Sequence, residues 1–397
     1  MQYLADLVTL FVVQRLPNLT EDGEKVPRCL RSGLDWCSSG RQPNVVPILI
    51  NTEKVSKRYR ESAIDLAGRR LLITNYRGTD QEADLSDPPN CRGFGRIRHF
   101  RRTTTPGWPP NPLPLDPACR ALGLSATDFL RAQVFQNAVC NWRCWYCYVP
   151  YNLLAGSRKY AEWLSPADLV ELYLDQPDPP LVLDLTGGQP DLTPEWIPWM
   201  MTELRSRGLD RTVYLWSDDN LSNDYFWRFL SDADRELVAS FPNYGRVCCF
   251  KGFDADSFSF NSRAAPELFE RQFELMRRLW SLGIDLYAYA TFTTARSKGV
   301  EKGIKRFVDR LQEIDPNLPL RTVPLEIQLF TPVYPRMTDG YEKFLQNQWI
   351  AIEAWQSELE NRYSAVQRRS NIASTALGES RWSDDRRCSM RRRIANE

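Results

Sequence analysis

Between residues 130 and 332 the sequence alternates between short apolar runs and segments of helical periodicity, and this alternation constrains the fold more than any other feature. Apolar runs separated by helices are typical of a parallel sheet whose outer face is covered by the helices. Such an α/β chain forms either an open doubly wound sheet or an incomplete barrel. Six runs of strand type occur, at residues 132–139, 181–187, 212–217, 246–252, 285–293 and 325–331.

Helix boundaries between these runs are marked by capping residues. Ser165 stands at a predicted N-cap, Pro166 follows at the first helical position, and Asp168 completes a capping box. Two other helices are predicted to end at Gly208 and Gly283, because glycine favours the position after a helix. The further helices are expected at residues 193–208, 223–240, 266–283, 300–314 and 341–366.

The pattern divides the chain into three regions. We expect an N-terminal extension of unknown role over residues 1–125, a core over 126–340, and a C-terminal helix with a basic tail over 341–397. Within the extension, residues 1–16 have the periodicity of an amphipathic helix, and residues 45–50 and 70–76 are of strand type. The Pro-rich segment 103–117 is expected to be a linker or a stiff strap across a surface.

The composition indicates a globular protein, and its net charge favours no particular class of binding partner. The chain of 397 residues has 51 Lys and Arg against 50 Asp and Glu, a formal net charge of +1. No apolar run reaches the roughly 20 residues that span a bilayer, and the N-terminal segment, with Asp6 and no basic start, is a poor secretory signal. We therefore expect a cytoplasmic protein without membrane contact. In a reducing compartment its cysteines point to metal or redox chemistry, not disulfides.

Three of the ten cysteines lie in one stretch, AVCNWRCWYCYVP, directly after the first strand-like run. Cys140, Cys144 and Cys147 could ligate a structural zinc ion that is completed by a remote cysteine or by His99. They could also hold a four-iron cluster with one iron open to a further ligand. The cluster is favoured, because catalytic loops follow the strands in such folds and zinc ligands usually come in two close pairs.

The spacing CNWRCWYC resembles the CxxxCxxC motif of the radical S-adenosylmethionine (radical SAM) superfamily, and the aromatic Tyr146 before the third cysteine matches as well. The resemblance covers about residues 130–332 and implies a partial (β/α)6 barrel of the TIM type, here with an N-terminal extension and a C-terminal helix. It also implies that Cys140, Cys144 and Cys147 ligate a [4Fe-4S] cluster whose fourth iron binds S-adenosylmethionine (SAM).

The same resemblance implies an activity. In that family the reduced cluster cleaves SAM, and the resulting 5′-deoxyadenosyl radical abstracts hydrogen from a substrate. A flavodoxin- or ferredoxin-type protein is the expected electron donor. The substrate is not indicated by the sequence: a small molecule, a peptide or protein, and an RNA all remain open.

The turn after the second run, LTGGQPDL, resembles the family's GGEP motif, which receives the amino group of SAM. Gly187, Gly188, Gln189 and Pro190 match the motif position by position, but Gln189 stands where glutamate is usual. A neutral amide can accept a hydrogen bond from an ammonium group, although it lacks the charge. By its residues alone the stretch is also a common strand-to-helix turn.

Polar residues after the third and fourth runs are further candidates. Ser217, followed by Asp219 and Asn220, is expected to bind the ribose or the methionine end of SAM, or else to cap a helix. Lys251, after the fourth run, resembles the strand-four lysine of radical SAM activating enzymes and would meet a carboxylate.

No catalytic side chain is identified, which suits a hydrogen abstraction that needs no general base. Gln328 and Arg336 follow the sixth run and are weaker candidates, and Cys248 and Cys249 are interpreted as packed strand residues. Four more cysteines have irregular spacings and are interpreted as plain thiols, with a second metal centre as the alternative. They are Cys29, Cys37, Cys91 and Cys119.

An Arg-rich segment with interleaved aromatics, CRGFGRIRHFRR at residues 91–102, has two interpretations. A solvated basic loop is favoured over a site for RNA or a phosphorylated substrate, because the whole chain is nearly neutral. The alternative function is accordingly a non-catalytic, zinc-stabilised protein that binds RNA or another protein.

Overall fold

The computed structural model describes residues 49–337 and 341–378, which belong to one compact unit. Several predictions lie outside the described residues: the helix at 1–16, nearly all of the strand at 45–50, Cys29, Cys37 and the basic tail. Of residues 45–50 the structure describes Leu49 and Ile50, and Ile50 forms an isolated β-bridge to Ala264.

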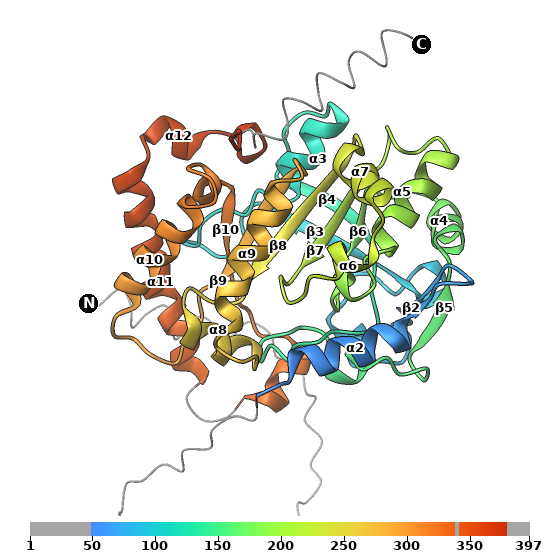
Figure 1. Cartoon of the computed structure of the whole chain (residues 1–397), viewed down its shortest axis with the longest axis horizontal. Coiled ribbons are helices and arrows are strands. Elements are labelled where there is room, and N and C mark those ends of the chain that lie inside the picture. The colour runs from blue at the N-terminus through green and yellow to red at the C-terminus, as the bar shows by residue number, and fades with distance from the viewer. Residues whose placement is uncertain (1–48, 338–340, 379–397) are drawn as a thin grey trace, which may run out of the picture. The chain divides into compact units, whose positions relative to one another are not determined.

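The predicted parallel sheet is present as a curled sheet of seven strands (Figure 1). Its order is β10-β9-β8-β7-β6-β4-β3, so the six parallel strands are neighbours in chain order. That winding in one direction defines a partial barrel, because a doubly wound sheet reverses its strand order. The strands are β3 (Gly95–Arg101), β4 (Phe129–Phe135), β6 (Val182–Leu185), β7 (Tyr214–Asp219), β8 (Tyr244–Phe250), β9 (Leu286–Thr291) and β10 (Thr322–Leu325).

Helices cover the outer face of this sheet (Figure 1). They are α4 (Pro166–Leu174), α5 (Trp196–Ser206), α6 (Tyr225–Phe229), α7 (Asp232–Ser240), α8 (Ala255–Ser262), α9 (Leu268–Trp280) and α10 (Val300–Gln312). Alternate strand residues such as Leu183 and Leu215 pack outward into one large apolar core with Met200 and Phe273 of these helices. The other alternate residues, such as Val182 and Trp216, form a second core on the inner face with α3 (Leu115–Leu122).

The predicted capping is confirmed where its residues are described. Ser165 and Asp168 form a reciprocal capping box at the start of α4. Gly208 and Gly283 have positive φ just beyond α5 and α9, as expected for glycine after a helix. The expected helix at 193–208 begins at Trp196 instead, because a 3-10 turn over Pro190–Leu192 precedes it.

The sixth strand was predicted too late in the chain. β10 covers Thr322–Leu325, so only Leu325 of the predicted run 325–331 lies in the strand. Residues 326–330 are irregular, and a 3-10 helix follows at Thr331–Arg336. The reason is the length of the neighbouring strand. β9 ends at Thr291, which pairs with Leu325, so the following residues find no ladder partner. Ile327 packs instead against Trp145 of the cysteine loop.

The Arg-rich segment is a strand and not a solvated loop. β3 pairs antiparallel with β4, so the extension contributes an edge strand to the barrel sheet. Arg96 and Arg98 lie on the inner face with Phe100, whereas His99 and Arg101 lie on the outer face.

A second sheet of three strands contains β1 (Ile64–Asp65), β2 (Arg70–Thr74) and β5 (Ala161–Leu164). Strand β2 confirms the predicted strand at 70–76. Helix α2 (Thr52–Ala63) precedes this sheet in the chain.

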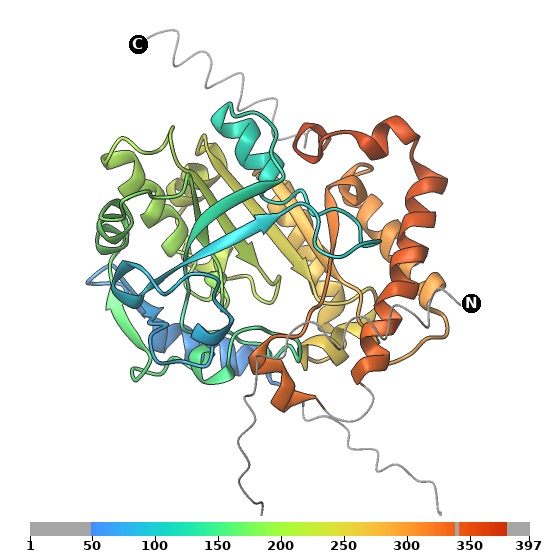
Figure 2. The same cartoon turned by 180° about the vertical axis from the view of Figure 1, so that it is seen from behind.

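The Pro-rich segment crosses the inner side of the sheet as a strap, seen from behind in Figure 2. Trp108 Nε1 donates to Pro324 O at 3.3 Å, and its ring meets Trp349 of α11 (Tyr341–Arg362) edge to face. Asn111 Nδ2 donates to Tyr289 Oη at 3.1 Å.

Two short elements follow α11 in the chain, α12 (Ala365–Arg369) and a 3-10 helix at Ile372–Ser374. Within residues 49–337 and 341–378, no helix has the length and apolar composition to cross a bilayer.

Candidate functional site

The cysteine loop follows β4 at the carboxyl end of the parallel strands. Cys140, Cys144 and Cys147 are free thiols and are half-buried, as are Arg143 and Tyr148, whereas the other residues of 138–150 are buried. Burial raises the pKa of the Cys140 thiol, and it raises the pKa of Cys144 to about 12. The three thiols are partly accessible, unlike the buried Cys248 and Cys249 of β8.

Two arginines fix the backbone of this loop. Arg143 donates to the carbonyl oxygens of Cys140 and Trp142 at 2.6 and 2.8 Å. Arg336, one of the weaker candidates, donates to the carbonyl oxygens of Cys147 and Val149 at 2.6 and 2.9 Å. Both ends of the cysteine triplet are therefore positioned by charge-assisted hydrogen bonds. Gln328, the other weak candidate, is exposed.

The loop's aromatic residues are anchors. Trp142 Nε1 donates to Thr52 Oγ1 at 3.1 Å, and Trp145 Nε1 donates to Asn261 Oδ1 at 3.0 Å. Tyr146, predicted to contact the cofactor, is buried with its hydroxyl 3.0 Å from Thr291 Oγ1. These hydrogen bonds satisfy the polar atoms of the buried rings.

Lys251, predicted to meet a carboxylate, lies after β8 on the inner face and is half-buried. Burial lowers the pKa of its ammonium group, but Tyr146, Cys249, Cys144 and Cys140 outweigh burial, so the pKa of Lys251 is raised. A fixed positive charge therefore lies beside the cysteine loop.

The glycine turn after β6 packs directly on the start of the cysteine loop. Gly188 has a φ of 67°, and a Cβ there would lie 2.4 Å from Val139 O and 2.5 Å from Asn137 O. Gln189 N also donates to Val139 O at 2.8 Å. Only glycine permits this approach, because any side chain would collide with the backbone of the cysteine loop. The two sequence motifs are thus brought together, with Gly187 and Gly188 both half-buried and Pro190 buried.

The side chain of Gln189 is committed within the protein. It is 1% exposed, its Nε2 donates to Asp219 Oδ1 at 2.8 Å, and its Oε1 accepts from Asn220 N at 2.9 Å. Asp219 also pairs with the buried Arg246 at 2.8 Å. At this position the resembled motif usually has glutamate. In this structure the Gln189 amide is needed instead, because a carboxylate at position 189 would lie against the carboxylate of Asp219.

Changing Gln189 to glutamate is therefore expected to destabilise the protein. The substitution replaces a donor by an oxygen that faces Asp219, a loss of about 1–3 kcal/mol in the free energy of unfolding. The loss should shrink as the pH falls, since a protonated carboxyl regains the donor. Urea unfolding at pH 8 and pH 5 measures both effects. Gln356→Glu, on an exposed face of α11, is the matched control and should change stability by less than about 0.5 kcal/mol; equal costs for the two variants would contradict the expectation.

The residues at the end of β7 divide between the two faces of the sheet. Ser217, predicted to bind the ribose or methionine end of SAM, is fully buried with its hydroxyl 2.7 Å from Tyr244 Oη, on the helix side. Asp219 lies on that side as well, with Arg246. Asn220 comes closer to the cysteines, with Nδ2 3.1 Å from Asn141 Oδ1 and 4.0 Å from Cys140 Sγ.

Two inner-face carboxylates were missed by the sequence analysis. Asp184 of β6 accepts from Arg98 Nη1 at 3.3 Å, and Asp218 of β7 accepts from Thr186 Oγ1. Beside them Arg96 Nη2 donates to Tyr148 Oη at 3.1 Å, which connects β3 to the residue after Cys147. A polar band therefore lines the inner face next to the cysteine loop. The only available signal was a polar residue at an inward position of each strand.

The charge state of Asp184 gives a pH-dependent prediction. Burial, with the nearby Asp218 carboxylate, raises the pKa of Asp184 to about 7, although Arg98 and Arg96 oppose the shift. In the unfolded chain the pKa of an aspartate is about 3.9, so Asp184 holds its proton up to a higher pH in the folded protein. The folding stability that this difference in pKa contributes is fully present below about pH 4 and is lost as the pH rises through 7.

Asparagine at 184 does not titrate, so Asp184→Asn should cost more stability at pH 5 than at pH 8, by an amount on the order of 2 kcal/mol. Urea unfolding of both proteins at the two pH values measures this difference. Asp178→Asn, at a side chain that is 79% exposed, should show no such dependence. The same cost for Asp184→Asn at both pH values would contradict the assignment.

The donor set consists of three half-buried thiols on one loop, which suits a four-iron cluster because such a cluster takes one thiolate per iron. Among the described residues, no three His, Cys, Asp or Glu side chains converge closely enough to hold one metal ion. His99 pairs with Asp87 at 3.0 Å on the outer face of β3, away from the inner-face band. Cys91 and Cys119 are buried thiols.

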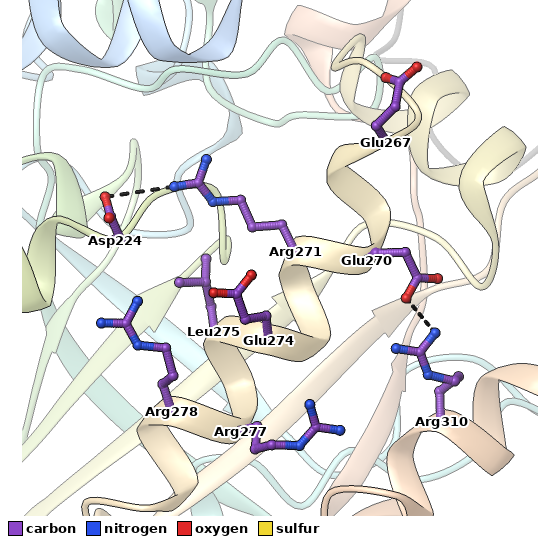
Figure 3. Close-up of a pocket in the computed structure, with 9 residues that line it drawn as sticks. All are labelled: Asp224, Glu267, Glu270, Arg271, Glu274, Leu275, Arg277, Arg278 and Arg310. Atoms are coloured by element: carbon purple, nitrogen blue, oxygen red, sulfur yellow. Dashed lines mark hydrogen bonds and ion pairs between the residues drawn. The ribbon is translucent and has the colours of Figure 1, made fainter.

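A hollow of about 550 Å³ lies elsewhere, on the outer surface along α9 (Figure 3). Its lining has four acidic and four basic residues, and two ion pairs form among them: Arg271 with Asp224 at 3.7 Å, and Arg310 with Glu270. Because these charges are compensated within the hollow, it offers no separate case for a ligand.

Comparisons with known proteins give limited information. No protein-family model and no curated protein matches the sequence. Solved structures with partial similarity include Streptococcus suis SuiB bound to S-adenosylmethionine, at 16% identity and a TM-score of 0.37, over 56% of this chain and 46% of that chain. Another is SuiB bound to the precursor peptide SuiA, at 15% identity and a TM-score of 0.33, over 46% of this chain and 36% of that chain. The chain thus spans less than half the length of these structures, and similarity of this extent identifies neither a ligand nor an activity.

Proposed function

We propose that this protein is a radical SAM enzyme. The observation that carries the proposal is the junction of its two motifs: the three free thiols of the loop after β4 and the Gly187–Pro190 turn after β6, connected through Gln189 N and Val139 O. Both lie at the carboxyl end of a partial barrel, where such folds place their chemistry.

Cys140, Cys144 and Cys147 would ligate three irons of a [4Fe-4S] cluster. When bound, the cluster and SAM supply the reductive cleavage that produces a 5′-deoxyadenosyl radical for hydrogen abstraction from the substrate. Lys251 offsets the negative charge of the thiolates. Arg143 and Arg336 fix the loop, and Trp145 with the residues after β10 excludes water from its outer side.

The glycine turn would receive the methionine end of SAM through its backbone. Gly187 and Gly188 carry no side chain and are half-buried, so a ligand can approach their peptide groups. The Gln189 side chain is already bonded at both ends, which leaves main-chain carbonyl oxygens as acceptors for an ammonium group. A flavodoxin- or ferredoxin-type donor in the cytoplasm would supply the electron.

The alternative, a zinc-stabilised protein that binds RNA or another protein, finds less support. Arg96 is 6% exposed and bonded to Tyr148, and Arg98 is paired with Asp184 inside the barrel. Phosphate groups of an RNA need exposed arginines, so these two are poorly placed for that role.

Anaerobic reconstitution of the full-length protein tests the proposal. Iron and sulfide are added, the protein is reduced with dithionite, and 5′-deoxyadenosine is measured after addition of SAM. We expect near four irons per chain and formation of product. Colourless protein with one zinc ion per chain and no product would overturn the proposal.

A further inference from the structure

The carboxamide of Asn220 lies beside the first thiol of the cysteine loop. Asn220 directly follows β7 and is 7% exposed. Its Nδ2 donates to Asn141 Oδ1 at 3.1 Å and lies 4.0 Å from Cys140 Sγ. An amide nitrogen carries two hydrogens, so it can serve both acceptors at once. The contact with sulfur is long for a neutral thiol, and it should shorten when Cys140 is a thiolate, because a charged acceptor draws its donor closer.

The orientation of the Asn220 amide follows from its neighbours. Ser56 Oγ donates to Thr52 O at 2.6 Å, so this hydroxyl accepts from Asn141 Nδ2 at 2.9 Å. The nitrogen of Asn141 is thereby placed, and its Oδ1 is the atom that faces Asn220. A reversed Asn220 amide would bring two acceptor oxygens together. Nitrogen, and not oxygen, therefore lies beside Cys140.

Two buried glutamines fix the main chain at Asn220. Asn220 N donates to Gln189 Oε1 at 2.9 Å, and Asn220 O accepts from Gln272 Nε2 at 3.1 Å. Gln189 is 1% exposed and Gln272 is 0% exposed. Because both backbone groups of Asn220 are bonded to buried side chains, its amide is held next to Cys140 by the fold itself.

A hydrogen bond to a thiolate ligand affects the electronic properties of the metal centre. Reduction of an iron–sulfur cluster by one electron adds negative charge that spreads onto its thiolates, so an N–H donor stabilises the reduced state more than the oxidised state. We infer that Asn220 is a positioning residue that acts through Cys140 and raises the reduction potential of the cluster. This inference rests on the proposed function, since the cluster belongs to that proposal.

A redox titration of the reconstituted full-length protein, at pH 8 and without SAM, tests the inference. The reduced cluster is followed by electron paramagnetic resonance. Asn220→Leu keeps the approximate size of the side chain and removes its donor. At a fixed potential, we expect the ratio of reduced to oxidised cluster to fall at least about threefold, which for one electron is a potential about 28 mV more negative.

Asn243→Leu is the matched control. Asn243 is also a buried asparagine, but it precedes β8 and so lies at the amino end of the parallel strands, away from the cysteine loop. Its replacement should leave the potential unchanged. Asn220→Asp, whose side chain has two acceptor oxygens and no donor when ionised, is the second variant if Asn220→Leu takes up no iron. It should also make the potential more negative.

An unchanged or less negative potential in an iron-loaded Asn220 variant would overturn the inference, as would an equal shift in Asn243→Leu. Loss of iron from both Asn220 variants would assign this residue to folding alone and would overturn the inference as well. If the unchanged protein forms 5′-deoxyadenosine and its potential does not depend on Asn220, this inference alone fails. If the unchanged protein takes up no iron, the proposed function fails and the inference fails with it.

Discussion

Replacing Cys144 with alanine is expected to remove the bound iron and to reduce 5′-deoxyadenosine formation to that of iron-free protein. A four-iron cluster needs one thiolate for each iron that the protein ligates, so the two remaining thiols cannot retain it. The change should be local, because Cys144 is half-buried and its backbone carbonyl already accepts from Tyr151 Oη at 2.9 Å. Iron content, the visible absorption spectrum and product formation measure the effect. Iron and product at wild-type levels in Cys144→Ala would contradict the ligand assignment.

Cys249→Ala is the matched control. Cys249 lies on the inner face of β8 and interacts electrostatically with Cys144, so among the described thiols it is a candidate for a fourth ligand. If one iron is left open for SAM, this variant should keep its iron and its product. Loss of metal in both variants would indicate a closed site with four thiolates, which has no position for SAM.

Replacing Arg246 with methionine is expected to cost about 3–5 kcal/mol in the free energy of unfolding. Arg246 is fully buried, with Nη2 bonded to Asp191 and, at 2.8 Å, to Asp219. Burial raises the pKa of Asp191 to about 7, and Arg246 is the cation that opposes that shift. Without the arginine, two carboxylates remain buried with no counter-ion.

The loss should be larger at pH 8 than at pH 5, because protonation of the carboxyl groups relieves it. Urea unfolding at the two pH values measures the dependence. Arg228→Met is the control: its ion pair with Asp224 spans 3.8 Å at a side chain that is 53% exposed, and its loss should cost less than about 1 kcal/mol. Similar costs for Arg246→Met and Arg228→Met would show that the buried triad adds no stability. Because Asp219 also bonds Gln189, the 187–190 turn should lose order in the same variant.

The sequence predicts the barrel well because its strands and helices differ in hydrophobic period. Runs such as 181–187 and 246–252 have the apolar continuity of buried strands, and the Ser165 capping box is a local signal that needs no tertiary context. The last strand is misplaced because its length depends on where β9 ends, which is a property of the neighbour and not of the run. β3 is missed because the five arginines of residues 91–102, three of them in the strand, indicate a loop, although the inward Arg96 and Arg98 are bonded to Tyr148 and Asp184 inside the barrel.

The candidate site is predictable where its residues form a contiguous motif. For the other site residues, the prediction depends on which face of its strand a side chain occupies. Successive residues of a strand point to opposite faces, so an error of one residue selects a side chain on the wrong face. Ser217 was selected and Asp218 was not, yet Asp218 is the inward residue of the two. Asp184 was missed because a single polar residue in an apolar run carries no signal of its partner, Arg98, 86 positions away.

The Arg336 contacts have a consequence for how the protein is made. The carbonyl oxygens of Cys147 and Val149 are bonded by a residue that leaves the ribosome 187 to 189 positions later. Since domains fold as units during synthesis, a nascent chain displays all three thiols long before the final barrel unit can fix them. Insertion of the proposed metal centre should therefore be completed after translation, and unfinished chains would expose these thiols to oxidation.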